Sequence, residues 1–408
     1  MKSNAGRFIK VFPWYYGMTG DLLFYIAIDT LFLTLVKNLS AAQIVSLSSL
    51  SQFICIALQF PVLFVIKRIG NTASVRTGAG FLLLSALTLT FCKSYYLLLL
   101  GRVFHDIAGI FHTASVVALE NNLELEDRRG DFVKVRTQGN TVYAMVTMLI
   151  SFVASMMFNL NHFLPMIGCI TTCALGFLLT FFMKDCSGYN KITPTRTKQE
   201  KLRFNYGALI VLAMVVYALF YPLVSEGQSI GKLFIQQELF LDFDTEKTAL
   251  IIGVVVCISR IIRVFSNMVF ARLYRIYKNK VGIALPVLLG IALSCQLFGS
   301  MLPLIPVKIC VMAFGYIIIL FARDPFRLYM QDVILEHTPK QQHQTLLTMM
   351  TFGIKVGTAG MGLAFSAILV NHPMSLVVAI MLTITVVEIL LSMKLYQMIR
   401  SARKAKTI

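Results

Sequence analysis

Long apolar stretches follow one another along the whole chain, separated by short polar segments. Each stretch has about 20 predominantly apolar residues, the length that an α-helix needs to cross the hydrocarbon core of a bilayer. Twelve stretches are predicted, near residues 12–36, 41–66, 73–92, 95–119, 136–158, 162–183, 206–238, 247–271, 281–301, 306–328, 345–370 and 373–393. The pattern therefore predicts an all-α integral membrane protein with twelve transmembrane helices.

The longest polar interruption divides the twelve stretches into six and six. It reads KDCSGYNKITPTRTKQEKLR at 184–203, and its Pro, Gly, Ser and Thr content is typical of a linker. The loop after the second stretch, VIKRIGNTASVR, has a counterpart after the eighth, RLYRIYKNKVG. We therefore expect two pseudo-symmetric six-helix bundles, 1–183 and 205–408, joined by a cytoplasmic linker at 184–204. Paired halves of this kind are common in secondary transporters.

The positions of the basic residues show whether the formal net charge of +18 indicates a polyanionic partner or a membrane orientation. Of 37 Lys and Arg residues, 27 lie in the termini and in alternate loops, whereas the opposite loops hold four. This is the positive-inside distribution of membrane proteins. It predicts a multi-pass protein of the plasma (inner) membrane with both termini in the cytoplasm. The charge orients the protein, so no nucleic-acid partner is expected.

No cofactor, metal site or enzyme activity is expected. The eight cysteines lie mostly inside the apolar stretches without a C-x-x-C pair, and the six histidines are scattered. An intramembrane enzyme needs a nucleophile–base pair or a metal motif such as H-E-x-x-H, which the sequence lacks. A channel is expected to supply rings of like residues, usually through oligomers. Enzyme and channel therefore remain remote alternatives.

The two halves, the long central basic loop and the short basic loops resemble the major facilitator superfamily. The family's motif G-x-x-x-D-R-x-G-R-R/K aligns on Arg68 and Gly70, but Leu63, Lys67 and Asn71 replace its first Gly, its Asp and its next Arg. The loss of the Asp removes the family's usual charge latch at the inner gate. The candidates for gating loops are Arg68, Gly70 and Arg275.

The resemblance implies a secondary active transporter that moves a small organic solute by alternating access. It also implies that helices 1, 4, 7 and 10 line a central cavity, with helices 2, 5, 8 and 11 beside them. The fourth-helix motif R-x-x-Q-G matches only at Arg102, which His105 and Asp106 follow. The fifth stretch lacks the G-P-x-x-G-G motif typical of drug–proton antiporters. An efflux antiporter for drugs or metabolites nevertheless remains the alternative.

Ionisable residues inside the apolar stretches fall almost entirely on the helices that the resemblance places at or beside the cavity. A carboxylate at the centre of a membrane helix costs at least ~2.5 kcal/mol, so such residues usually have a role. The outlier is Glu388 in the twelfth stretch. The others are Asp21, Asp29, Arg102, Asp106, Glu226, Lys232, Arg260, Arg263, Arg323, Asp324 and Lys355.

The carboxylates among these residues are candidates for proton coupling. Asp21, Tyr25 and Asp29 follow i, i+4, i+8 and would share one side of a continuous helix. A salt bridge to a neighbouring helix is the competing interpretation. His105 and His112, seven residues apart, are either packing residues or groups that titrate near neutral pH. The proton-coupling candidates are Asp21, Asp29, Asp106 and Glu226.

The basic residues favour, weakly, a substrate with an anionic group. Arg260 and Arg263 lie one turn apart with no acid on the same helix, and Arg suits bidentate capture of a carboxylate or phosphate. Pairing with an acid across the bundle is the alternative. In the seventh stretch, Pro222 predicts a broken helix that carries a site, or an ordinary kink. The substrate-binding candidates are Arg102, Tyr25, Gln228, Arg260, Arg263 and Lys355. The expected partners are a small-molecule substrate, protons (or Na⁺) and the lipid bilayer, for a monomeric carrier.

Overall fold

Helices account for nearly all of the structure. The computed structural model describes residues 2–128, 131–186, 207–277, 280–338 and 343–407, and no strand occurs in these ranges. The predicted all-α fold class is therefore confirmed. Most of the predicted linker, residues 187–204, lies outside the described residues.

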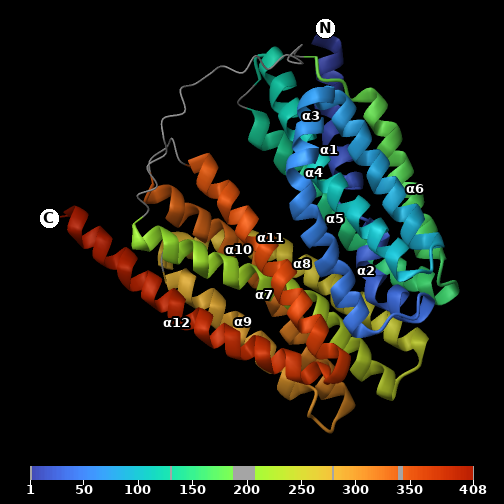
Figure 1. Cartoon of the computed structure of the whole chain (residues 1–408), viewed down its shortest axis with the longest axis vertical. Helices are drawn as coiled ribbons and strands as arrows, with labels where there is room; N and C mark the ends of the chain where they lie inside the picture. Colours follow the sequence, from blue (N-terminus) through green and yellow to red (C-terminus); the bar gives the residue numbers. More distant parts are fainter. Residues whose placement is uncertain (1, 129–130, 187–206, 278–279, 339–342, 408) are drawn as a thin grey trace. The chain divides into compact units, whose positions relative to one another are not determined.

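Twelve α-helices follow one another through the described ranges (Figure 1). They are α1 (Lys2–Thr19), α2 (Leu23–Leu31), α3 (Ala41–Phe91), α4 (Tyr95–Leu125), α5 (Phe132–Leu160), α6 (Leu164–Leu179), α7 (Ala208–Asp242), α8 (Thr245–Tyr277), α9 (Val281–Gly299), α10 (Ile305–Glu336), α11 (His343–Asn371) and α12 (Met374–Thr407). A π-helical turn, η1 (Phe32–Val36), extends α2, and a 3₁₀ turn, η3 (Thr180–Phe182), extends α6. Pro165 and Pro306 stand in the first turns of α6 and α10, where their missing N–H breaks no helical hydrogen bond.

Ten helical stretches in the described part of the chain are long and apolar enough to cross a membrane, with the region from α1 to η1 counted as one. One of them, α3, has 51 residues and holds the second and third predicted stretches, which meet at Gly70. Gly70 has φ 80° and ψ 168°, a conformation that other residues rarely adopt. The eighth predicted stretch lies on α8, which is not among the ten. Every predicted stretch thus overlaps at least one helix, while the count of twelve crossings stays a prediction.

The first predicted stretch is interrupted, because three residues separate α1 from α2. A Cβ atom added at Gly20 would lie 2.9 Å from the ring of Tyr143 on α5, so the break packs closely against that helix. Asp21 lies in the break, whereas Tyr25 and Asp29 lie on α2. The expectation that these three residues share one face of a continuous helix is therefore wrong.

The break predicted in the seventh stretch is not observed, since α7 continues through Pro222. A Cβ atom added at Gly357 of α11 would lie 2.7 Å from the Pro222 ring, so α11 packs directly on this part of α7. Neighbouring helices commonly make a proline tolerable inside a membrane helix. Of the two alternatives for the seventh stretch, the broken helix that carries a site is therefore wrong.

The chain forms two compact units, which we call the first unit (residues 1–38 and 50–202) and the second unit (residues 39–49 and 203–408). The start of α3 belongs to the second unit, where the Ser366 hydroxyl of α11 donates a hydrogen bond to the carbonyl oxygen of Ala42 at 2.8 Å. The predicted bundle boundaries fall in a region of which most lies outside the described residues, so they stay a prediction.

In the first unit, α1 packs against α4, α5 and α6 (Figure 1). Its aromatic residues Phe8, Phe12 and Tyr15 are at most 1% exposed and join Ala114 and Ala118 of α4 in one apolar cluster. Lipid chains are as apolar as these side chains, so close packing rather than exclusion from water holds membrane helices together. This packing fixes the faces of α1 and α4 that meet.

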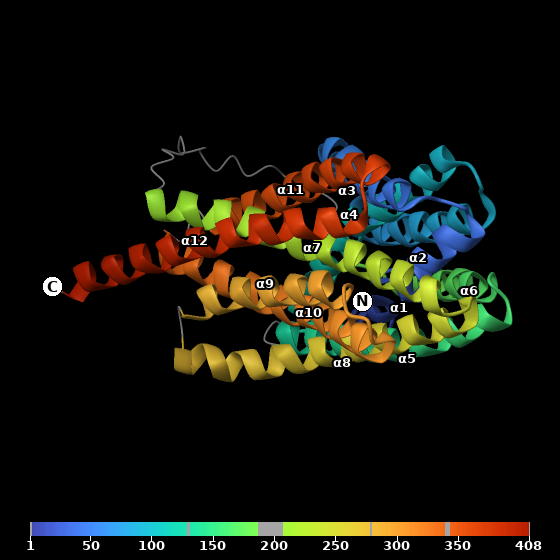
Figure 2. The same ribbon diagram turned by 90° about the horizontal axis from the view of Figure 1, so that it is seen from below.

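In the second unit, α10 contacts α7, α8 and α9, and α12 packs on α7 and α9 (Figure 2). The backbones approach closely at small residues: a Cβ atom added at Gly315 of α10 would lie 2.5 Å from the carbonyl oxygen of Ala292 on α9. The rings of Phe220 on α7 and Phe326 on α10 lie with centroids 3.8 Å apart. These contacts hold the charged turn of α10, described below, against α7.

Lys37 has a structural role in the first unit. It is 8% exposed, and its Nζ donates hydrogen bonds to the carbonyl oxygens of Thr90 and Cys92, both at 2.7 Å. These two acceptors lie at the C-terminal end of α3, where helical carbonyls lack intrahelical partners. Lys37 therefore caps that end of α3.

Replacing Lys37 by Met should lower the free energy of unfolding by about 2–3 kcal/mol, because two charge-assisted hydrogen bonds are lost. Thermal melting of the protein in detergent measures the change. The matched control is Lys93→Met on the exposed neighbouring loop, which should melt with the wild type. An equal loss of stability in both variants would contradict the capping role.

Candidate functional site

Three titratable side chains of the first unit meet at the break between α1 and α2. His105 of α4 places Nε2 at 2.8 Å from Oδ1 of Asp21 and Nδ1 at 3.4 Å from Oδ1 of Asp106. The backbone N–H of Leu22 also donates to Oδ1 of Asp21, at 2.8 Å. The three side chains are 17–32% exposed, so they are partly shielded from water. An imidazole between two carboxylates is well placed to take up and release a proton.

Arg102 lies one turn before Asp106 on α4 and interacts electrostatically with Tyr25, Asp21, Asp29 and Asp106. Asp106 is not a partner of Arg102 alone, because its carboxylate also contacts His105. The Nε of Arg102 is buried without a hydrogen-bond partner among the described residues. Three carboxylates thus face one guanidinium and one imidazole, and this acidic surplus gives the region a capacity for protons.

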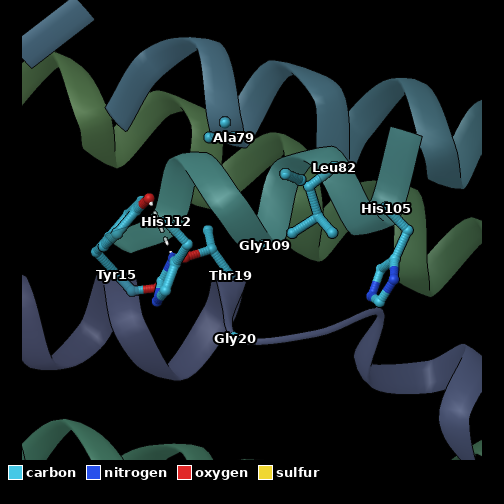
Figure 3. A pocket seen from close by; sticks show the side chains of 10 residues that line it. Tyr15, Thr19, Gly20, Ala79, Leu82, His105, Gly109 and His112 are labelled. Carbon is cyan, nitrogen blue, oxygen red and sulfur yellow. Dashed lines mark hydrogen bonds between the residues drawn. The ribbon is translucent and has the colours of Figure 1, made fainter. Parts of the chain in front are cut away.

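A cavity of about 210 Å³ lies beside this cluster, between α1, α3 and α4 (Figure 3). We call it the α1–α4 cavity; its lining residues are Tyr15, Thr19, Gly20, Gly78, Ala79, Leu82, His105, Ala108, Gly109 and His112. His105 lies at one end of the cavity and His112 at the other (Figure 3). The small residues of α3 and α4 leave this space open.

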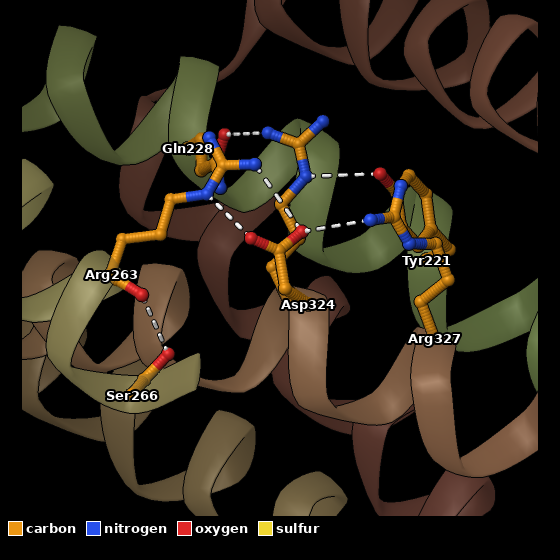
Figure 4. A network of polar contacts seen from close by, with 7 residues as sticks. Tyr221, Gln228, Arg263, Ser266, Asp324 and Arg327 are labelled. Atoms are coloured by element: carbon orange, nitrogen blue, oxygen red, sulfur yellow. Dashed lines mark hydrogen bonds and ion pairs between the residues drawn. The ribbon is translucent and has the colours of Figure 1, made fainter. Parts of the chain in front are cut away.

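The second unit holds a cluster of arginines around one carboxylate (Figure 4). Arg263 of α8 donates two hydrogen bonds to Asp324 of α10, from Nε at 2.7 Å and from Nη2 at 3.2 Å. Arg327, one turn further along α10, lies 3.8 Å from the same carboxylate. The partner of Arg263 is therefore an acid on α10, in the same half of the chain. This bidentate geometry is the strongest form of arginine–carboxylate contact.

Arg323, beside Asp324 on α10, contacts two residues of α7. Its Nε donates to the Tyr221 hydroxyl at 3.1 Å, and its Nη1 donates to Oε1 of Gln228 at 3.0 Å. The guanidinium also lies 5.3 Å from the centroid of the Tyr221 ring, in cation–π range. Because Tyr221 and Gln228 are seven residues apart on α7, they lie on one face of that helix. We call Arg263, Arg323, Arg327, Asp324, Tyr221 and Gln228 the arginine cluster.

The arginine cluster carries more positive charge than its one carboxylate balances, and it has more N–H donors than acceptors. Its three guanidinium groups face one carboxylate, and Arg260 lies one turn before Arg263 on α8. The Nε of Arg260 and the Nε2 of Gln228 are buried N–H groups without hydrogen-bond partners among the described residues. Buried donors of this kind favour a ligand that supplies acceptor oxygens.

The other predicted site residues lie apart from these two clusters or at their edges. Glu226 of α7 is 5% exposed, with Oε1 against Gly362 of α11, and its carboxyl group has no hydrogen bond or ion pair within the described residues. Lys355 is half-buried on α11, and Asp29 is half-buried on α2, where it accepts a hydrogen bond from the Thr30 N–H at 2.8 Å.

The gating-loop candidates lie at two points of the chain. Arg68 is exposed, and Gly70 forms the joint within α3. Arg275 lies on α8, but its side chain is outside the described residues. Their role in a gate stays a prediction.

The predicted site left out Tyr221, Arg323, Asp324 and Arg327, which carry most of the arginine cluster. A signal for them was present, since three charges within five residues of an apolar helix are rarely accidental. The seven-residue spacing of Tyr221 and Gln228 was a second, weaker signal. For metals, no group of three or more His, Cys, Asp or Glu side chains that could hold an ion occurs in the described ranges.

Comparison by sequence finds no relative: no protein-family profile and no curated protein matches the chain. Comparison by structure finds membrane transporters. The nucleoside transporter NupG has a TM-score of 0.72 and 14% identity, over 96% of this chain and 99% of that one. The peptide transporter POT has a TM-score of 0.72 and 12% identity, over 97% and 94% of the two chains. An inward-facing bacterial homologue of the iron transporter ferroportin has a TM-score of 0.66 and 10% identity, over 96% and 98%.

These structures match the chain along nearly its whole length, and they are transporters rather than enzymes. At 10–14% identity the likeness concerns the fold. Together with ten stretches apolar enough to cross a membrane in the described part, it identifies a multi-pass membrane protein. The chain therefore shares the fold of these solved transporter structures.

Proposed function

We propose that this protein is a secondary active transporter that carries a small organic solute with an anionic group, driven by protons, through alternating access. One observation carries the proposal: the buried charges gather in two clusters of opposite character inside apolar helices. The first unit has an acidic surplus around His105, and the second unit has a basic surplus around Asp324. Charges inside membrane helices generally mark a substrate or ion pathway.

The arginine cluster supports an anionic group on the solute. Arginine presents a rigid fork of donors that matches a carboxylate or a phosphate. Asp324 occupies part of this donor set through its bond to Arg263, while the unpartnered N–H groups of Gln228 and Arg260 remain for a ligand. In this proposal Asp324 is the internal counter-ion, and the solute's anionic group is held by Arg323 together with those donors.

The fold gives no information about which solute is carried, because the similar structures are named as transporters of nucleosides, peptides and iron. The charge of the arginine cluster supports an anionic solute over a hydrophobic cation, the usual cargo of a drug efflux antiporter. Repulsion by several guanidinium groups would oppose the entry of a cation. Efflux of an anionic metabolite remains compatible with the cluster, since direction is independent of binding.

The Asp21–His105–Asp106 group supports protons as the driving ion. His105 contacts a carboxylate at each ring nitrogen, so addition or loss of one proton changes the balance of the whole group. The buried, unpartnered Glu226 is a second candidate, in the second unit. We propose a monomer in the plasma (inner) membrane. The basic residues in alternate loops support the orientation with both termini in the cytoplasm.

Thermal-shift screening of the purified protein tests the proposed substrate class. A panel of organic carboxylates, organic phosphates, amino acids, nucleosides, sugars and hydrophobic cations is compared at equal concentration. Compounds with an anionic group should stabilise the wild type, because a ligand that binds the folded state raises its melting temperature. Arg323→Gln should lose this stabilisation.

The matched control is Arg128→Gln, which removes an arginine from the exposed pair with Asp131 in the first unit. This variant should respond to the panel as the wild type does. Stabilisation by hydrophobic cations alone, or by neutral nucleosides equally in the wild type and Arg323→Gln, would contradict the proposed substrate class.

A further inference from the structure

The α1–α4 cavity connects two histidines that both lie on α4. His105 and His112 are seven residues apart, so about 10 Å of helix separates them. His105 forms one end of the cavity, with Asp21 at 2.8 Å. His112 forms the other end, where its ring stacks on Tyr15 with centroids 5.5 Å apart and its Nδ1 lies 3.5 Å from the Tyr15 hydroxyl (Figure 3). A single space therefore extends from the proton-binding group to a second imidazole.

The lining of the cavity suits water better than a charged solute. Its polar side chains are the two imidazoles and the hydroxyls of Tyr15 and Thr19, and no Asp, Glu, Lys or Arg is among its lining residues. Nothing in the lining therefore supplies a fixed charge for an anion. A volume of about 210 Å³ holds several water molecules, and the hydroxyls and imidazoles give them hydrogen-bond partners.

The charged groups around the two histidines differ. His105 faces Asp21 from the break before α2, and Asp106 and Arg102 from its own helix. His112 packs between the rings of Tyr15 and Tyr16 of α1, and the charged group that acts on it is Arg136 of α5. Two carboxylates thus lie at the His105 end of the cavity, whereas an arginine acts on the His112 end. This difference in charge favours the binding of a proton at the Asp21 end.

We propose that the α1–α4 cavity is a water-filled passage through which protons exchange between the cytoplasm and the Asp21–His105 pair, with His112 as a relay at its cytoplasmic end. This inference rests on the proposed proton coupling and on the predicted topology, in which Tyr15 lies nearer the cytoplasmic end of α1 than Asp21 does. One proton leaves cytoplasmic water, passes along His112 and the cavity water, and binds the pair. The net charge of the pair changes from minus one to zero, and no electron moves.

Gly109 allows the passage to be closed without disturbing the packing. A Cβ atom added at Gly109 has no atom within 4 Å, although the residue lines the cavity. Gly109→Leu should therefore place its side chain in this space. Gly360 of α11, in the second unit, also has nothing within 4 Å of an added Cβ, so Gly360→Leu is the matched control.

Two measurements on protein in liposomes need no cargo. Infrared difference spectra after a pH jump follow protonation of the Asp21–His105 pair, with the bands assigned by Asp21→Asn. Labelling of His105 by diethyl pyrocarbonate, read by mass spectrometry against the exposed His162, reports access of a small water-borne reagent. In Gly109→Leu, both proton uptake and His105 labelling should slow by an order of magnitude or more. His112→Gln should slow proton uptake alone, and Gly360→Leu should change neither.

Proton uptake at the wild-type rate in Gly109→Leu, with or without loss of labelling, would overturn the passage. Uptake at the wild-type rate in His112→Gln would overturn the relay. If organic anions no longer stabilise Gly109→Leu, the cavity is the site that binds the solute. That result would also overturn the proposal. Because proton access is measured without cargo, a failure of transport itself shows separately, as a wild type that accumulates no anion under a pH gradient.

Discussion

Asp21→Asn should exchange substrate across the membrane at a rate close to that of the wild type but lose accumulation driven by a pH gradient. Asparagine keeps the shape of aspartate and can still accept the hydrogen bond from the Leu22 N–H. It cannot form the charged contact with His105 at 2.8 Å, so the pair no longer binds and releases a proton in the transport cycle. Exchange needs only binding and the conformational change, whereas accumulation needs the coupled proton.

Proteoliposomes loaded with an organic anion from the thermal-shift panel measure both activities. Counterflow of labelled anion reports exchange, and uptake with an acidic exterior reports accumulation. The control is Asp29→Asn on α2, a carboxylate that the structure does not pair with His105; it should keep most of the accumulation. If Asp21→Asn still accumulates the anion against its gradient, the Asp21–His105 pair is structural.

Asp324→Asn should be the most destabilising single substitution in the second unit. Asp324 is the carboxylate partner of both Arg263 and Arg327, at 2.7 and 3.8 Å. Its removal leaves partly buried guanidinium groups without a counter-charge, and breaking a buried pair in this way costs roughly 3–5 kcal/mol. The protein should melt at a lower temperature in detergent and accumulate less in the membrane.

A second substitution distinguishes loss of charge balance from loss of shape. Arg263→Gln added to Asp324→Asn removes both charges of the bidentate pair, so a large part of the lost stability should return. Asp131→Asn is the control, because its pair with Arg128 is exposed and such pairs contribute about 0–1 kcal/mol. Equal melting of Asp324→Asn and wild type would mean that Asp324 does not hold the arginines together.

The helices could be predicted because a bilayer leaves the backbone few alternatives. Apolar stretches of sufficient length must satisfy their backbone groups internally, so hydropathy alone locates them. The break in the chain was assigned to the wrong helix for a physical reason. Pro222 lacks an N–H, yet contact with α11 lets α7 continue, whereas Gly20 and Asp21 contain nothing that forbids a helix. The break at Gly20 and Asp21 packs closely on α5, and this contact exists only in the folded unit, so the local sequence does not predict it.

Some residues of the candidate site were predicted from the sequence, but their contacts were not. Burial of charge showed that Asp21, Arg263 and Asp324 were unusual, since each lies within an apolar stretch. Which charge meets which depends on how each helix is rotated about its axis, and a periodic pattern does not give that rotation between helices. The pairing of Arg263 with Asp324 follows from the packing of α8 on α10.

The joint at Gly70 has a consequence for how the protein is made. One residue in a glycine conformation, φ 80°, connects the two apolar segments of α3, and Val62 before it and Phe81 after it pack in one cluster with α4. The connection between the two segments is too short for one of them to enter the bilayer well before the other. During synthesis they should therefore insert together, as a helical hairpin. The backbone conformation of Gly70 thus determines the order in which these two segments enter the bilayer.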